Sequence, residues 1–177
     1  MAEQFRRVVT GHDEQGKSVF IEDGPAPNVK SIDSMPGLFV TDLWVTGSAP
    51  ADNRGNADAA DRPIVLDPPP RGTVFRVVEF PPDSAWRESA DVKEAFGSIG
   101  GAHASCADPD DVMMHKTATV DYVLILKGEI WAILEDGVEA CLKQGEFMVQ
   151  RGTVHSWSVR TPEPCLMAVV LIDADPV

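Results

Sequence analysis

Positive charge is scarce in this chain of 177 residues, which holds 15 lysine and arginine residues against 28 aspartate and glutamate residues. The formal net charge is therefore −13. Nucleic acids and anionic membrane surfaces are bound mainly by clustered Lys and Arg side chains. We therefore expect neither as a partner, and we expect a soluble protein that repels other anions at long range.

Long apolar runs and ordered cysteine motifs are also missing. The longest apolar run, 165–172, is far shorter than the roughly 20 residues that a membrane-spanning helix needs. The three cysteines show no CxxC spacing, so a cysteine-based zinc site has no support. Residues 1–11 lack the apolar segment of a secretory signal. These absences predict a cytoplasmic protein with free thiols.

Helical periodicity is weak except near residues 90–96, where Ser89 would cap a short helix and Gly97 would follow its end. Elsewhere, short apolar segments alternate with turns rich in glycine and proline. The predicted strands are 6–10, 18–22, 38–46, 73–80, 118–127, 129–135, 138–142, 146–150, 155–159 and 165–172. Many short strands with regular turns predict an all-β fold, a single antiparallel barrel with at most one or two short helices.

The N-terminal part of the chain differs from the rest. Residues 47–72 are rich in Ala, Asp, Asn, Gly and Pro, which indicates a loop or arm. We expect residues 1–70 to form N-terminal strands and an arm that joins the barrel or a dimer interface, and residues 71–177 to form the barrel. Strand 122–126 is apolar on both faces, so its second face needs a cover. A partner subunit or the N-terminal strands would supply it, and we expect a homodimer.

Most of the residues that could bind a metal ion or take part in catalysis lie in two segments, 115–129 and 145–157. Their residues resemble the two motifs of the cupin superfamily, roughly G-x5-H-x-H-x3,4-E-x6-G and G-x5-P-x-G-x2-H-x3-N. Counting back from Gly128 places Asp121 at the family's glutamate and His115 at its first histidine. Counting forward from Gly152 places His155 at the histidine of the second motif. The resemblance covers about residues 71–173 and implies a jelly-roll barrel.

The chain is more narrowly similar to small single-domain cupins. Their sequences begin like Arg6-Arg-Val-Val-Thr-Gly-His-Asp13, and their motifs read like Met114-His-Lys-Thr and Gln150-Arg-Gly. Some fungal and bacterial members are associated with secondary-metabolite pathways, and some are described as oxidoreductases. The resemblance therefore implies an enzyme that acts on a small organic molecule.

Three departures from the family motifs bear on metal binding. Thr117 stands where the second histidine is usual, which removes one customary ligand. Asp121 replaces glutamate, so the charge is kept but the side chain is one methylene shorter. In the second motif, Gln150 and Val159 occupy the usual proline and asparagine positions.

The spacing of the three candidate ligands can be examined without the family. His115 and Asp121 are an even number of residues apart, so on one continuous strand they share a face. His155 lies on another strand, and neighbouring strands bring such side chains within about 5 Å. Two imidazoles and one carboxylate leave three open positions on an octahedral ion, an arrangement typical of non-haem Fe(II). One divalent ion is expected, with Fe(II) favoured and Zn, Mn, Ni or Co also accepted.

The rest of the predicted site is a mostly apolar cup that suits a small apolar or aromatic substrate. The predicted lining residues are Thr117, Val123, Ile125, Trp157 and Arg76. Arg76 would point inward and hold a substrate carboxylate, and the alternative is a surface pair with Glu79 or another acidic residue. No catalytic residue beyond the metal ligands can be assigned.

The other residues of reactive or metal-binding types are expected to have structural roles or to be exposed to solvent. His12 is expected in a turn, and His103 is expected in an exposed loop, with a lid over the site as the alternative. Cys106 has no sequence neighbour that would activate a nucleophile. The acidic run of Asp108, Asp110 and Asp111 lacks the EF-hand spacing and is expected to be a solvated loop. The tryptophans at 44, 86 and 131 are expected in the core or an interface.

Three functions remain open at this point. The first is a metal-dependent oxidoreductase, of dioxygenase type, in which substrate and dioxygen occupy adjacent open positions. The second is a redox-neutral isomerase, dehydratase, cyclase or decarboxylase that uses the ion as a Lewis acid. The third is a small-molecule-binding barrel without catalysis. A nicotinamide or flavin enzyme and a serine hydrolase are not expected, because neither glycine-rich fingerprint nor G-x-S-x-G is present.

Overall fold

The computed structural model describes residues 2–106, 108 and 111–177, and this part of the chain is mostly β-structure. Every strand pairing in it is antiparallel, and one short α-helix is present, which confirms the predicted fold class. The strands are β1 (Arg6–His12), β2 (Ser18–Pro25), β3 (Val29–Ser31), β4 (Phe39–Thr46), β5 (Thr73–Phe80), β6 (Thr119–Lys127), β7 (Glu129–Leu134), β8 (Glu139–Lys143), β9 (Phe147–Arg151), β10 (His155–Ser158) and β11 (Cys165–Asp173). The helices are α1 (Val92–Ser98) and two 3-10 turns, η1 (Asp83–Ala85) and η2 (Glu135–Gly137).

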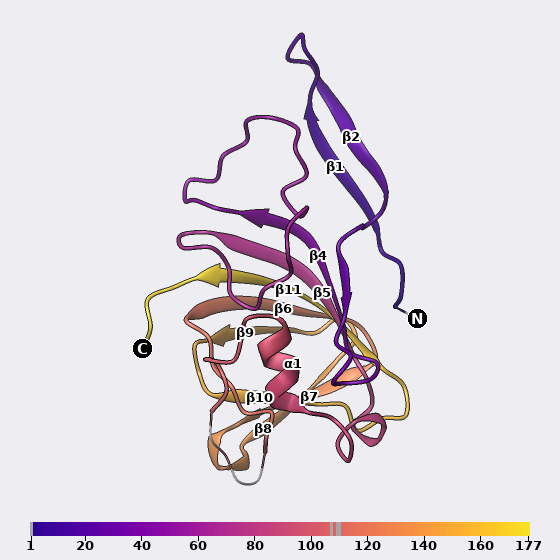
Figure 1. Ribbon diagram of the computed structural model, residues 1–177, viewed down its shortest axis with the longest axis vertical. Helices are drawn as coiled ribbons and strands as arrows, with labels where there is room; N and C mark the ends of the chain where they lie inside the picture. The colour runs from indigo at the N-terminus through magenta and orange to yellow at the C-terminus, as the bar shows by residue number, and fades with distance from the viewer. Residues whose placement is uncertain (1, 107, 109–110) are drawn as a thin grey trace.

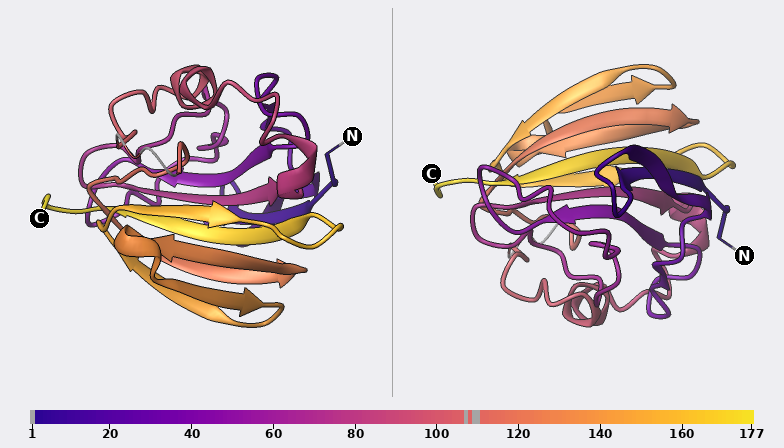
Figure 2. Two further views of the ribbon diagram at one scale, coloured as in Figure 1. Left: turned by 90° about the horizontal axis from the view of Figure 1, so that it is seen from below. Right: turned by 90° about the horizontal axis from the view of Figure 1, so that it is seen from above.

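The strands form three sheets (Figure 1). The largest has the order β3-β4-β5-β11-β6-β9, and a second has the order β10-β7-β8. The remaining pair, β1-β2, is a hairpin that projects from one end of the molecule. Figure 2 shows α1 on the opposite side of the molecule from the orange strands.

The inner face of the six-stranded sheet follows a period of two. Along β6, the side chains of Thr119, Asp121, Val123 and Ile125 are buried, whereas Tyr122 is exposed. One core cluster joins such inward residues of β5, β6 and β11 to those of β7 and β10. A second cluster lies where α1 and the segment after β3 pack near β4. The sheet therefore has a buried concave side, where the two clusters meet, and an outer side.

Helix α1 begins later than the sequence predicts. Its N-cap is Asp91, whose carboxylate accepts a hydrogen bond of 2.9 Å from the main-chain nitrogen of Glu94. Ser89 hydrogen bonds to the carbonyl of Trp86 instead, and Gly97 lies inside the helix. The predicted cap was wrong because aspartate two residues later offers a better-placed acceptor. Phe96 and Ala95 bury the helix against the second core cluster.

The N-terminal part of the chain contributes to the main sheet. Strand β4 pairs with β5 along its whole length, and the short β3, which the sequence did not predict, pairs with β4. The hairpin is tied to the following loop by an ion pair between Arg7 and Asp58, at 2.5 Å. Strands β3 and β4 thus belong to the six-stranded sheet.

None of the helices in the described part of the chain is both long enough and apolar enough to cross a membrane.

Candidate functional site: a paired-histidine cavity

His115 and His155 face each other across an isolated antiparallel bridge. The main-chain nitrogen of each donates a hydrogen bond of 2.9 Å to the carbonyl of the other. Because directly opposite residues in such a pair place their side chains on one face, the two imidazoles come together. Their ring centroids are 4.3 Å apart, and the ring of Phe96 lies 4.9 Å from that of His115. The main-chain pairing therefore holds together the two histidines, which were identified in the sequence by counting residues from Gly128 and Gly152.

Both imidazoles are held in one tautomer. Nδ1 of His115 lies 2.8 Å from the carbonyl of Met113, and Nδ1 of His155 lies 3.0 Å from that of Thr153. A carbonyl only accepts, so each Nδ1 carries the proton and each neutral ring keeps its lone pair at Nε2. Burial lowers the pKa of His155 to about 3, with His115 adding to the effect, and burial also lowers the pKa of His115. Two neutral nitrogen donors result.

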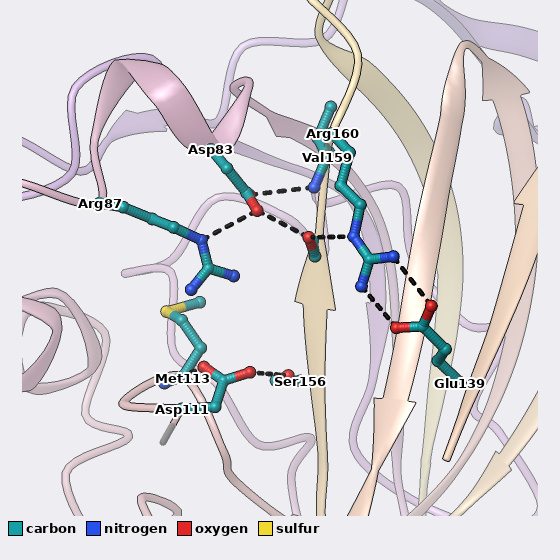
Figure 3. A network of polar contacts seen from close by, with 9 residues as sticks. Asp83, Arg87, Asp111, Met113, Glu139, Ser156, Val159 and Arg160 are labelled. Carbon is teal, nitrogen blue, oxygen red and sulfur yellow. Dashed lines mark hydrogen bonds and ion pairs between the residues drawn. The ribbon is translucent and has the colours of Figure 1, made fainter. Parts of the chain in front are cut away.

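A polar network on the other side of β10 holds this strand in place (Figure 3). Asp83 accepts hydrogen bonds from the Ser158 hydroxyl, at 2.6 Å, and from the main-chain nitrogen of Val159, at 3.0 Å. The Ser156 hydroxyl donates to Asp111, at 2.5 Å, and Asp111 also accepts from the main-chain nitrogen of Met113, at 3.0 Å. The loop that leads into His115 is thereby tied to the strand that carries His155.

Asp121 lies on the inner face of β6 and is almost fully buried. Its Oδ1 atom is the one buried side-chain oxygen or nitrogen in the described part of the chain that has no hydrogen-bond partner. Burial raises the pKa of Asp121 to about 6, although the Thr119 hydroxyl and the charge of Arg76 oppose the rise. An acceptor with a lone pair in an apolar cavity is costly unless something binds to it.

Arg76 points inward and is buried, as one of the two sequence interpretations proposed. Its partner is Asp42, not Glu79, because Asp42 lies directly opposite on β4. Arg76 Nε lies 2.9 Å from Asp42 Oδ1, and Nη2 donates to the carbonyl of Val65 at 2.7 Å. The guanidinium is thus largely engaged within the protein. The sequence missed Asp42, although a single acidic residue inside the apolar segment 38–46 was a usable signal.

These residues line one cavity of about 130 Å³ between the two core clusters. Its polar members are Arg76, His115, Thr117, Asp121 and His155, and its other walls are apolar. Of the predicted lining residues, Thr117, Val123, Trp157 and Arg76 all reach the cavity. Ile125 does not line it, because it lies farther along β6 in the packed core and is only 1% exposed. Phe96 and Met113 line the cavity too and were not predicted, since both lie outside the motifs.

The fit of a metal ion can be judged from these donors. The two histidines meet the chemical needs of nitrogen ligands, because each is neutral and oriented through Nδ1. Among residues 2–106, 108 and 111–177, however, no three His, Cys, Asp or Glu side chains form a group placed to hold a metal ion. Thr117 bonds to the Thr119 hydroxyl, at 2.7 Å. The two histidines can offer a metal ion two nitrogen ligands, but the described residues do not form a complete three-ligand site.

The remaining candidates lie away from the cavity. His12 is exposed, and His103 is exposed with its Nε2 atom 2.8 Å from Asp67 Oδ2. Cys106 is half-buried, and its thiol donates to the carbonyl of Ala104. Asp111 belongs to the network of Figure 3, and Asp110 lies outside the described residues.

The chain is similar to several fungal proteins, some of which are named for biosynthesis clusters. The chain is 28% identical to phomopsin biosynthesis cluster protein C' of Diaporthe leptostromiformis, over 97% of this chain and 79% of that protein. It is 29% identical to oryzines biosynthesis cluster protein J of Aspergillus oryzae, over 98% and 86%. It is 26% identical to the cupin-domain-containing oxidoreductase virC of Hypocrea virens, over 97% and 77%.

No family model matches the chain. Among solved structures, the cupin domain of Schizosaccharomyces pombe Cnp3 is 11% identical, with a TM-score of 0.46 over 98% of this chain and 89% of that chain.

Proposed function

Because this chain is a cupin-domain protein, we propose that it is an oxidoreductase that acts on a small, mostly apolar organic molecule within the cavity. The observation that carries the proposal is the histidine pair, which presents two neutral nitrogen donors to a largely apolar pocket. Apolar pockets with a few convergent polar groups are the usual form of small-molecule sites.

The relatives support both the reaction class and the kind of substrate. Proteins of Hypocrea virens, Aspergillus ruber and Neurospora crassa that match most of the chain are named cupin-domain-containing oxidoreductases. Others are named for phomopsin and oryzines biosynthesis clusters. We therefore propose a secondary metabolite or its precursor as the substrate.

A divalent metal ion remains part of the proposal, with Fe(II) favoured over Zn, Mn or Ni. His115 and His155 would hold it, and it would supply Lewis acidity or one-electron chemistry when bound. Asp121, predicted from the sequence as the third ligand, shares the cavity with them. The protein's own part is to orient both imidazoles, to exclude water with apolar walls and to bind the substrate.

A non-catalytic binding barrel is the second candidate. It is favoured by one observation, the lack of a three-ligand group in the described part of the chain. In this case the cavity would bind the same class of small molecule and release it unchanged.

Metal analysis of protein purified without a histidine tag separates the two. We expect sub-stoichiometric to stoichiometric Fe(II) or Zn in the wild type and its loss in His155→Ala, while the matched control His12→Ala retains it. Turnover is then measured with Fe(II), with and without oxygen. Loss of turnover without oxygen supports the oxidoreductase, and equal turnover with Zn under anaerobic conditions favours redox-neutral chemistry. If no metal binds and no candidate substrate is turned over, the binding barrel stands.

A further inference from the structure

The unpartnered oxygen of Asp121 is the least explained atom of the cavity. The side chain is 6% exposed and faces inward, and Oδ1 has no hydrogen-bond partner among the described residues. A buried acceptor without a partner loses its hydration and gains nothing in return. A site that keeps such an atom at the wall of a pocket is suited to a ligand that brings a donor.

The Thr119 hydroxyl interacts with the Asp121 carboxyl, but no side chain in the described part of the chain hydrogen bonds to Oδ1. The charge of Arg76 acts on Asp121, but the hydrogen bonds of Arg76 go to Asp42 and to the carbonyls of Val65 and Leu66. The histidines carry their Nδ1 protons to main-chain carbonyls and are not assembled with Asp121 into a metal-binding group. The third-ligand role predicted from the sequence therefore does not account for Oδ1 in this structure.

The charges of the cavity indicate what kind of donor is acceptable. Arg76 is matched by Asp42, at 2.9 Å, so Asp121 is left as an additional acidic group. A substrate carboxylate would meet this group in a poorly solvated space, where like charges repel strongly. The arrangement favours a neutral ligand and argues against the carboxylate substrate that Arg76 suggested from the sequence.

The size of the cavity sets a second limit. Its volume of about 130 Å³ is close to that of apolar protein cavities, about 150 Å³, that hold one benzene molecule. Most of its walls are aliphatic or aromatic side chains, among them Phe96, Trp157 and Met167. The space is therefore of the size that holds about one six-membered ring.

We propose that Asp121 Oδ1 accepts a hydrogen bond from the hydroxyl group of a neutral, single-ring substrate. This inference rests on the small-molecule site of the proposed function and names its substrate class, a phenol-like or cyclic alcohol molecule. Asp121 is then the residue that orients the ring relative to the histidine pair, rather than a metal ligand.

Binding of three probes to the chelator-treated full chain tests the proposal by titration calorimetry or NMR. Phenol offers a donor, toluene has the same shape without one, and benzoate carries a charge. A hydrogen bond to a charged acceptor is worth roughly tenfold or more in affinity. We expect phenol to bind, benzoate not to bind, and the phenol-to-toluene affinity ratio to fall at least about tenfold in Asp121→Leu. Asp121→Asn should lower the ratio less, and it serves if Asp121→Leu does not fold.

The matched control is Met167→Leu, a volume-conserving change in the same cavity wall. It should alter both affinities together and leave their ratio unchanged. An equal ratio in wild type and both Asp121 variants overturns the proposal, as does a failure of phenol to bind the wild type. If the protein turns over a substrate but the phenol-to-toluene affinity ratio is unchanged in the Asp121 variants, this inference alone is overturned. If the ratio falls in the variants but the wild type turns over no substrate with any metal, the proposed oxidoreductase alone is overturned.

Discussion

Single residues decide the character of the cavity, and the Arg76–Asp42 pair shows how much a buried partner matters. Both side chains are 3% exposed and lie 2.9 Å apart. Removing one member of a buried ion pair leaves the other charge uncompensated, which costs about 3–5 kcal/mol. We expect Asp42→Ala to lower the free energy of unfolding by about this amount in urea denaturation. The matched control is Asp23→Ala, which breaks the exposed Arg6–Asp23 pair and should have little effect. Equal losses in both variants would contradict the prediction.

The buried carboxyl of Asp121 makes a pH-dependent contribution to stability. Its folded pKa is about 6, whereas an unfolded aspartate has a pKa near 3.9. Between about pH 4 and 6 the folded state holds a proton that the unfolded chain has released, so this contribution falls as the pH rises. Asp121→Asn removes it. The stability of Asp121→Asn relative to wild type should therefore increase between pH 4 and pH 7, by as much as about 3 kcal/mol. Denaturant unfolding of metal-free protein at both pH values measures this, and a pH-independent difference would refute it.

The sequence predicts well which side chains face the interior, but it predicts poorly which residues those side chains pair with. The period of two correctly indicates that Asp121 and Val123 share one face of a strand. The pairing of Asp42 with Arg76 depends on the register of β4 against β5, which shifts between Asp42 and Trp44. Such a bulge has no clear signature in one sequence, so the partner of Arg76 could not be derived.

Among the elements, the turns that join the strands differ in how tightly they are packed. Gly128 and Gly145 both adopt positive φ angles, 77° and 83°. A Cβ on Gly128 would lie 2.9 Å from the carbonyl oxygen of Pro164, whereas a Cβ on Gly145 would meet nothing within 4 Å. We expect Gly145→Ala to cost about 1–2 kcal/mol from backbone strain alone. Gly128→Ala should cost about 1–3 kcal/mol more, because main-chain atoms must move. Urea melts of the two variants compare them directly, and equal costs would show that the crowding is relieved.

Element prediction succeeded where local chemistry is strong. The segment 73–80 was predicted with the bounds of β5, because Pro81 and the preceding loop delimit it sharply. Strand β3 has three residues, too few for any period to show, and it depends on its pairing with β4. Helix α1 was displaced by two residues, since Ser89 and Asp91 are both good caps and only the packed structure distinguishes them.

At the scale of the whole molecule, the outer side of the six-stranded sheet forms an apolar groove with the β1-β2 hairpin. The groove measures about 770 Å³, and its lining includes Phe5, Val8, Trp44, Phe75, Tyr122 and Phe147. Phe147 is 74% exposed, and so is Phe20 on the hairpin. Apolar patches of this kind mark interaction sites.

We propose that a second copy of the chain covers the apolar groove. Each copy carries both a groove and a projecting hairpin with exposed apolar side chains, so a two-fold arrangement would cover both at once. Light scattering should give about twice 19.1 kDa. Phe147→Glu should shift the mass toward the monomer, while Val138→Glu, at the exposed position that follows η2 and lies outside the groove, should not. A wild-type monomer at micromolar concentration would refute the proposal.

Net charge gives this association a characteristic salt dependence. Two chains of net charge −13 repel one another, and the repulsion is screened as ionic strength rises. The dimer should therefore tighten between low and physiological salt, which analytical ultracentrifugation measures. Weakening with added salt would indicate ion pairs across the interface rather than apolar contact.

The order of strands in the main sheet has a consequence for the timing of folding during synthesis. Strand β11 lies between β5 and β6, and it pairs with both along most of its length. Until residues 165–173 have left the ribosome, β5 and β6 have no strand to join them, and their apolar inner faces stay unpaired. The main sheet can therefore close only after residues 165–173 have been synthesised. We therefore expect a truncation before β11 to yield insoluble protein rather than a smaller folded barrel.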